Sequence, residues 1–262
     1  MSSSYPQIVV TGDSMAQQSF RIGGYGAALV DAYQGKADVI NRGMAGYTPQ
    51  QFLDKLKDDF QWPNGVVKLI VLHIGTNDST TRGFQHIPAE EFTQIMKAIL
   101  KFLREAQPNA KVILLTPSTI DVAAWITFCT EQGLPSEFAD NRSPESIKQI
   151  RDAVLQVAKD ENAGVLDVWK LHDDAVNRGE LQTSELFWDG LHYSERAYAY
   201  INKALLQLIS TSYRSLLPAS MPEGFTMFAV YGNENNPEAQ NLAKITYKNI
   251  EAIKQAALGN TT

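Results

Sequence analysis

The chain has 262 residues, of which 44% are hydrophobic, and this is enough to build one large domain around a full core. Its net charge of -6 at pH 7 argues against nucleic acid or an anionic membrane as the main partner, because both bind to positively charged patches. The single cysteine, Cys129, excludes an intrachain disulfide. The N-terminus lacks the basic and apolar segments of a secretory signal, and no apolar run reaches membrane-spanning length, so we expect a cytoplasmic protein without stable membrane insertion.

The first half of the chain alternates short apolar runs, typical of buried strands, with segments of helical periodicity. A β-branched run at 7–11 is followed at once by Gly12-Asp13-Ser14, which predicts a strand that ends in a tight turn. The run at 68–74 (KLIVLHI) is apolar nearly throughout and predicts a strand covered on both faces. The other elements predicted here are a helix at about 24–33, a strand at 37–41, a helix capped by Thr48 and opened by Pro49, and a helix at 88–106.

The second half continues the alternation. We predict strands at 111–116 and 164–168, a helix from Ser143 to about 162, a helix capped by Ser194 that ends near 217, and a less regular insert at 118–142. Strands that alternate with helices at this spacing indicate an α/β fold, a parallel sheet with helices on both faces. In such sheets, sites form at the carboxyl ends of the strands.

The chain divides into a main domain at 1–218 and a C-terminal extension at 219–262. The extension begins as a loop, and Asn236-Pro237-Glu238 then predicts a helix to about Leu258, closed by Gly259. It contains no residue pattern typical of catalysis. We expect this helix to pack back on the domain or to form a subunit contact in a homo-oligomer.

Asp189 and His192 lie three residues apart, just before the helix that Ser194 caps. At this spacing the carboxylate can reach the imidazole, fix its tautomer and support the charge that it acquires as a base. Ser14, directly after the first strand, is the candidate nucleophile. These three residues predict the nucleophile, base and orienting acid of acyl transfer.

Acyl transfer also needs donors for the developing oxyanion. We expect the backbone N–H groups of Ser14 and Gly46 and the side-chain amide of Asn77 to fill this role, since all three follow predicted strands. Gly43 competes with Gly46, and either glycine could instead serve only to supply a positive φ.

Four blocks, in order, resemble those of the SGNH (GDSL) hydrolases. They are Gly12-Asp13-Ser14, the stretch 41–46 (NRGMAG), Gly75-Thr76-Asn77-Asp78 and Asp189-Gly190-Leu191-His192. The resemblance covers roughly 7–217 and implies Ser14, Gly46, Asn77 and His192 as the family residues, with Asp189 completing the triad. It also implies a flavodoxin-like, three-layer α/β/α fold with a central parallel five-stranded sheet, and ester hydrolysis without a metal or other cofactor.

A narrower resemblance is to the isoamyl acetate-hydrolysing esterase branch. It rests on the stretches 26–30 (GAALV) and 42–48, on Asp121 with Trp125, and on the block 189–194. Two residues depart from the expected pattern: Met15 follows the serine, and the bulky Trp188 precedes Asp189. We place Met15, Trp125 and Trp188 in the substrate pocket, where Trp188 would narrow the acyl side.

Other residues have plainer interpretations. Asp13 and Asp78 suit turn hydrogen bonding better than a metal site. His73 is expected in the core and His86 and His172 on the surface, without metal-like spacing, and Cys129 is expected to be inert. The aromatic residues Trp125, Phe128 and Phe138 suit an acyl pocket or the core equally.

We therefore predict a serine esterase that hydrolyses small carboxylic esters, such as acetates of short alcohols, through an acyl-enzyme on Ser14. A carbohydrate O-acetyl esterase, a lysophospholipase or a thioesterase of the same fold is the alternative within enzymes. A non-catalytic binding or scaffold protein is the alternative outside them, and it predicts that a catalytic position is lost.

Overall fold

A computed structural model describes residues 5–222 of the protein. Its centre is a parallel five-stranded sheet in the order β2-β1-β3-β4-β5. The strands are β1 (Pro6–Gly12), β2 (Asp38–Gly43), β3 (Val66–His73), β4 (Lys111–Leu115) and β5 (Gly164–Leu166). This order confirms the predicted flavodoxin-like sheet.

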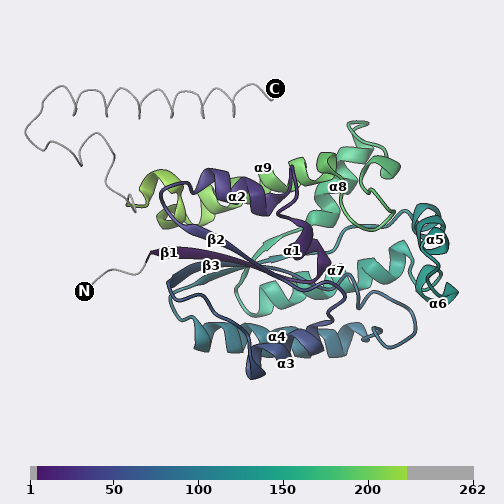
Figure 1. Ribbon diagram of the computed structural model, residues 1–262, viewed down its shortest axis with the longest axis horizontal. Coiled ribbons are helices and arrows are strands. Elements are labelled where there is room, and N and C mark those ends of the chain that lie inside the picture. Colours follow the sequence, from purple (N-terminus) through teal and green to yellow (C-terminus); the bar gives the residue numbers. More distant parts are fainter. Residues whose placement is uncertain (1–4, 223–262) are drawn as a thin grey trace, which may run out of the picture. The chain divides into compact units, whose positions relative to one another are not determined.

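Helices cover both faces of the sheet because successive strand residues point to opposite sides. Ile8 and Val10 contact the core under α2 (Tyr25–Ala32), α8 (Val168–Asn177) and α9 (Glu195–Ser212). Val9, between them, faces the core under α3 (Pro49–Asp58), α4 (Ala89–Ala106) and α7 (Pro144–Asp160). Figure 1 shows the two helical layers above and below the sheet. The predicted three-layer α/β/α fold is confirmed.

The helix starts follow the capping signals of the sequence. Thr48 forms a capping box with Gln51 at the start of α3, and Pro49 occupies the first turn. Ser143 and Ser194 cap α7 and α9 in the same way, through their hydroxyl oxygens. The last of these caps, two residues after His192, fixes where α9 begins.

α9 ends at Ser212 rather than near 217, and two other regions also differ from the prediction. The insert at 118–142 contains two helices, α5 (Val122–Glu131) and α6 (Ser136–Ala139), where an irregular segment was expected. The last strand ends at Leu166, and α8 begins at Val168. In both places an aspartate caps the unexpected helix: Asp121 accepts from Ala124 N–H and Asp167 from Lys170 N–H.

The predicted C-terminal helix at 236–258 lies outside the described residues. In the described part of the chain, no helix combines the length and the apolar character needed to cross a bilayer.

Candidate active site

Three predicted site residues follow three neighbouring strands. Ser14 opens the short helix α1 (Ser14–Gln18) directly after β1, a loop at 43–47 follows β2, and Asn77 follows β3. β1 lies between β2 and β3, so these segments meet at one edge of the sheet. Asp13 fastens two of them together, because its carboxylate accepts from the N–H groups of Met15 at 2.9 Å and Thr76 at 3.2 Å.

The structure brings Ser14, His192 and Asp189 into one hydrogen-bonded chain. His192 Nε2 lies 2.9 Å from Ser14 Oγ, and His192 Nδ1 lies 2.6 Å from Asp189 Oδ2. A carboxylate only accepts, so Nδ1 carries the proton and Nε2 is left to accept from the serine hydroxyl. This is the tautomer in which the imidazole can remove a proton from Ser14.

The charge on Asp189 is held in place by its surroundings. Burial alone would raise the pKa of this carboxyl group, but the His192 ring and the N–H groups of His192 and Leu191 stabilise the ionised form and lower the pKa below its ordinary value. The two N–H groups donate to Asp189 Oδ1 at 2.7 Å and 2.9 Å. The aspartate is therefore an anion that faces the imidazole.

The segment that carries Asp189 and His192 leads into α9 and packs against the start of α5. Its Gly190 has φ +95, and a Cβ there would lie 2.3 Å from Trp125 N, so only glycine lets the loop approach α5 this closely. Asp121 N–H donates to Gly190 O at 2.9 Å, and Trp188 N–H donates to His192 O at 3.0 Å. The insert at 118–142 thus positions the histidine, although it lies far from it in sequence.

The loop at 43–47 presents a free backbone donor. Gly46 has φ +81, whereas Gly43 is required for a different reason: a Cβ at Gly43 would lie 2.1 Å from Gln17 N. Within residues 5–222, the Gly46 N–H has no hydrogen-bond acceptor. The Ser14 N–H is likewise free, as expected for the first residue of a helix. Asn77 Nδ2 donates one hydrogen to Tyr47 O at 3.0 Å, which leaves its second hydrogen available.

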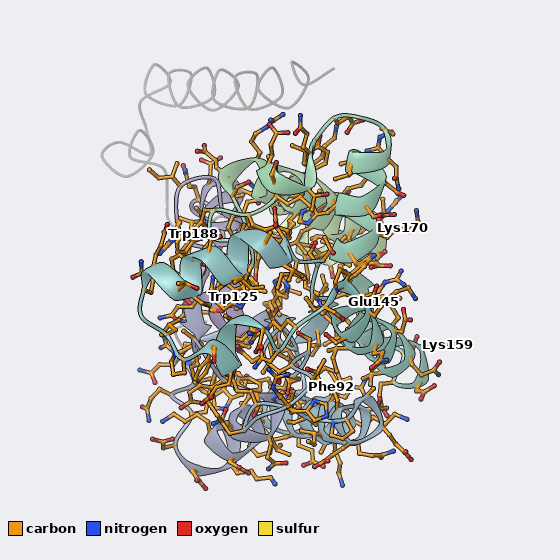
Figure 2. All side chains as sticks on the ribbon, turned by 90° about the vertical axis from the view of Figure 1, so that its right-hand side faces the viewer. Phe92, Trp125, Glu145, Lys159, Lys170 and Trp188 are labelled. Carbon is orange, nitrogen blue, oxygen red and sulfur yellow. The ribbon has the colours of Figure 1, made fainter. Side chains whose placement is uncertain are left out.

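Aromatic rings surround the imidazole. Trp188 stacks on His192, with ring centroids 5.8 Å apart and planes inclined by 21°, and Trp125 meets it edge-on at 6.3 Å. Phe128 contacts both tryptophans. Figure 2, which looks onto this end of the molecule, shows Trp125 and Trp188 near one another.

The proposed pocket residues differ in their exposure. Trp188 is 49% exposed, Trp125 only 7% and Met15 only 2%. Met15 and Trp125 both belong to the hydrophobic core, whereas Trp188 has the exposed surface that a substrate could contact. Phe138 accepts a hydrogen bond from Trp125 Nε1 through its carbonyl, at 3.1 Å.

The carboxylates at 13 and 78 are both buried. Burial raises the pKa of Asp13 to about 6, and hydrogen bonds from backbone N–H groups oppose the rise. Burial also raises the pKa of Asp78, whose two oxygens have no hydrogen-bond partner in the structure. The turn-bonding interpretation therefore describes Asp13 and does not describe Asp78.

Of the three remaining histidines, two lie where they were predicted and one does not. His73 is fully buried between the hydroxyls of Tyr25 and Tyr193, as expected for a core residue, and burial lowers its pKa to about 3. His172 was expected on the surface but is 0% exposed, because it lies on the face of α8 that packs under α9. His86 is exposed, as predicted.

Residues 10–200 match the model of the GDSL-like Lipase/Acylhydrolase family. The chain belongs to this family. It is 33% identical over 218 residues to an isoamyl acetate-hydrolyzing esterase 1 homolog of Bos taurus, with 81% of this chain and 84% of that protein covered. A GDSL esterase/lipase of Arabidopsis thaliana is 30% identical over 245 residues, which cover 89% of this chain and 97% of that protein. The protein is accordingly a carboxylic ester hydrolase with an ester substrate.

Solved structures agree on the fold. An acetyl xylan esterase superposes with a TM-score of 0.59 at 20% identity, over 78% of this chain and 99% of that one. A catalytic mutant of an acetylxylan esterase from Geobacillus stearothermophilus gives a TM-score of 0.56 at 20% identity, over 80% and 95% of the two chains.

The sequence did not reveal two glutamines beside the 43–47 loop. Gln17 Oε1 accepts from Ala45 N–H at 2.9 Å, and Gln85 Nε2 donates to Gly46 O at 2.9 Å. Neither residue is part of a local pattern, because each reaches the loop only through the fold.

Proposed function

We propose that the protein is a serine esterase for small carboxylic esters, with Ser14, His192 and Asp189 as its catalytic triad. The observation that carries the proposal is the hydrogen-bonded chain from Ser14 Oγ through the His192 ring to Asp189. This geometry supports nucleophilic catalysis, since a ring whose Nδ1 donates to Asp189 presents Nε2 to accept from the serine.

In the first half of the reaction, Ser14 Oγ attacks the ester carbonyl while His192 Nε2 takes its proton. Asp189 supports the imidazolium that forms. The N–H groups of Ser14 and Gly46 and the free hydrogen of Asn77 Nδ2 donate to the oxyanion. His192 then protonates the leaving alcohol. Water repeats the sequence on the acyl-enzyme and releases the acid.

The aromatic surroundings of His192 support a small, compact ester. Trp125 and Trp188 contact the imidazole from two sides, so the space beside the reacting carbonyl is bounded by rings. The 33% identical relatives named as isoamyl acetate-hydrolyzing esterase homologs support an acetate of a short alcohol.

A carbohydrate acetate is the second candidate. Trp188 offers a half-exposed ring beside His192, and such a ring can stack on the apolar face of a sugar. Solved acetylxylan esterases share the fold, which is compatible with this substrate but does not favour it over others.

The test is hydrolysis of p-nitrophenyl acetate, butyrate and octanoate, together with isoamyl acetate and acetylated xylooligosaccharides. We expect the wild type to cleave the short esters best and Ser14→Ala to fall to background. Preference for octanoate would replace the small-ester proposal with a lipid or thioester substrate. Full activity in Ser14→Ala would overturn the serine mechanism.

A further inference from the structure

The backbone that carries the Gly46 N–H has no side chain of its own to hold it in place. Gly46 has no side chain, and the space around an ideal Cβ at this position is empty to 4 Å. Glycine also has the widest backbone freedom of any residue. The direction of this N–H therefore depends on hydrogen bonds to the neighbouring peptide groups.

Those neighbouring groups are fastened on both sides. Before Gly46, the Ala45 N–H donates to Gln17 Oε1 at 2.9 Å, and the Met44 N–H donates to Gly12 O at 2.8 Å. After Gly46, its own carbonyl accepts from Gln85 Nε2 at 2.9 Å. The same peptide group is also held through the Tyr47 N–H, which donates to Met44 O at 3.2 Å, so the shorter Gln85 bond is a second restraint on ψ of Gly46.

Gln85 is suited to this task by its burial. Its side chain is only 8% exposed, so water competes poorly for its amide. Gln17, on the other side of the loop, is exposed. Of the two glutamines that bind the loop beside Gly46, Gln85 therefore provides the stronger restraint.

The segment that carries Gln85 is itself anchored. Thr81 N–H donates to Asn141 O at 2.7 Å, and His86 N–H donates to Gly83 O at 3.1 Å. The His86 ring also binds Thr80 O through Nδ1. The amide of Gln85 thus projects toward the 43–47 loop from a turn that is held by hydrogen bonds.

We propose that Gln85 is a positioning residue for the oxyanion site, which it serves by holding the Gly46 carbonyl so that the Gly46 N–H points at the developing charge. This role rests on the proposed serine-esterase function. Gln85 does not contact the reacting atoms. Its loss leaves the peptide group after Gly46 with one hydrogen bond fewer, so the backbone at Gly46 turns more freely, and a misdirected donor stabilises the transition state less than a fixed one.

The matched pair for the test is Gln85→Met and Gln7→Met. Gln7 is also buried, at 9% exposure, and its side chain makes one hydrogen bond to a glycine, from Gly65 N–H at 2.7 Å, at the opposite end of β1. Both substitutions keep the length of the side chain and remove one partly buried hydrogen bond to the backbone. We expect similar decreases in melting temperature.

The two variants should differ in catalysis. For p-nitrophenyl acetate we expect Gln85→Met to lower kcat about 10- to 100-fold with KM nearly unchanged, and Gln7→Met to leave kcat unchanged. Affinity for a trifluoromethyl ketone, which forms a tetrahedral oxyanion on the serine, should fall by the same factor as kcat. A rise in KM at constant kcat would overturn the proposal, because it would make Gln85 a substrate contact.

A second variant isolates the donor. Gln85→His offers an N–H near the position of the amide nitrogen, so it should recover part of the kcat lost in Gln85→Met; equal losses in the two variants would contradict the proposal. The ¹H–¹⁵N NOE of Gly46 measures the restraint without turnover, and we expect it to fall in Gln85→Met but not in Gln7→Met. Inactivity of the wild type on every ester would refute the proposed function, whereas an unchanged NOE would refute the role of Gln85.

Discussion

The molecule contains two serine–histidine pairs with the same separation. Ser14 Oγ lies 2.9 Å from His192 Nε2, and Ser118 Oγ lies 2.9 Å from His172 Nδ1. The second nitrogen of each ring has a different partner: the Asp189 carboxylate for His192 and the carbonyl of Ala197 for His172. Distance between serine and histidine therefore does not identify a nucleophile.

The environment of each ring decides what it can do. The His192 ring is 16% exposed at the open end of the sheet, and an anion supports the charge that it gains as a base. His172 is 0% exposed, and burial lowers its pKa to about 4. A neutral carbonyl cannot offset that penalty, so His172 remains an unprotonated packing element that binds α8 to α9.

The largest expected difference between the two pairs is the change in kcat when the serine is replaced by alanine. Ser14→Ala should lower kcat by about 10⁴-fold or more, because the nucleophile is gone. Ser118→Ala should keep kcat and lose about 1–3 kcal/mol of stability, since a buried imidazole nitrogen loses its donor. Ester hydrolysis and urea unfolding of both variants measure the two quantities. A large fall in kcat for Ser118→Ala would contradict the assignment of catalysis to the Ser14 pair alone.

The next largest effect concerns Asp189, the third residue of the proposed triad. Asp189→Asn removes the charge that supports the protonated ring and allows the wrong tautomer of His192, so we expect kcat to fall about 10³- to 10⁴-fold. The melting temperature of the variant is the control, because Asp189 Oδ1 also accepts from two backbone N–H groups. Loss of less than tenfold in a folded variant would show that Asp189 does not support the base.

A smaller effect is the contribution of His172 to acid sensitivity. Its folded pKa, about 4, lies below the unfolded value of 6.5, so the unfolded chain binds the extra proton first as the pH falls. The contribution of the neutral His172 ring to the free energy of unfolding is fully present above pH 6.5. Roughly 3 kcal/mol of it is lost as the pH falls through 4.

His172→Gln retains a donor and an acceptor but does not titrate. The variant should be less stable than the wild type at pH 7, and the difference between them should shrink as the pH falls from 6.5 to 4. Urea unfolding at several pH values measures this. A constant difference across that range would mean that the pKa of His172 is the same in the folded and unfolded protein.

The same two pairs show what the sequence could reveal. Asp189 and His192 are three residues apart, and Ser14 and Asn77 each follow a strongly apolar run, so local signals were enough to propose them as partners. Ser118 and His172 meet only through the packing of α8, a helix that was missed because the apolar stretch after Gly164 resembled a longer strand. Gln85 reaches Gly46 across 39 residues, and nothing near it in sequence indicates the contact.

The smallest effect tests the aromatic contact that each histidine makes. Tyr193 meets the His172 ring edge-on at 5.3 Å, inside the core, whereas Trp188 stacks on His192 and is 49% exposed. Removing Trp188 removes its ring contact with His192, worth about 0.5–1.5 kcal/mol, so Trp188→Ala should lower kcat/KM for p-nitrophenyl acetate about 2- to 10-fold.

Trp188→Phe, which keeps a ring over the imidazole, is the control and should lose less. If Trp188 also narrows the acyl side, Trp188→Ala should raise the rate on octanoate relative to acetate, because the opened space admits a longer chain. An unchanged chain-length preference in Trp188→Ala would confine this tryptophan to supporting the ring of His192.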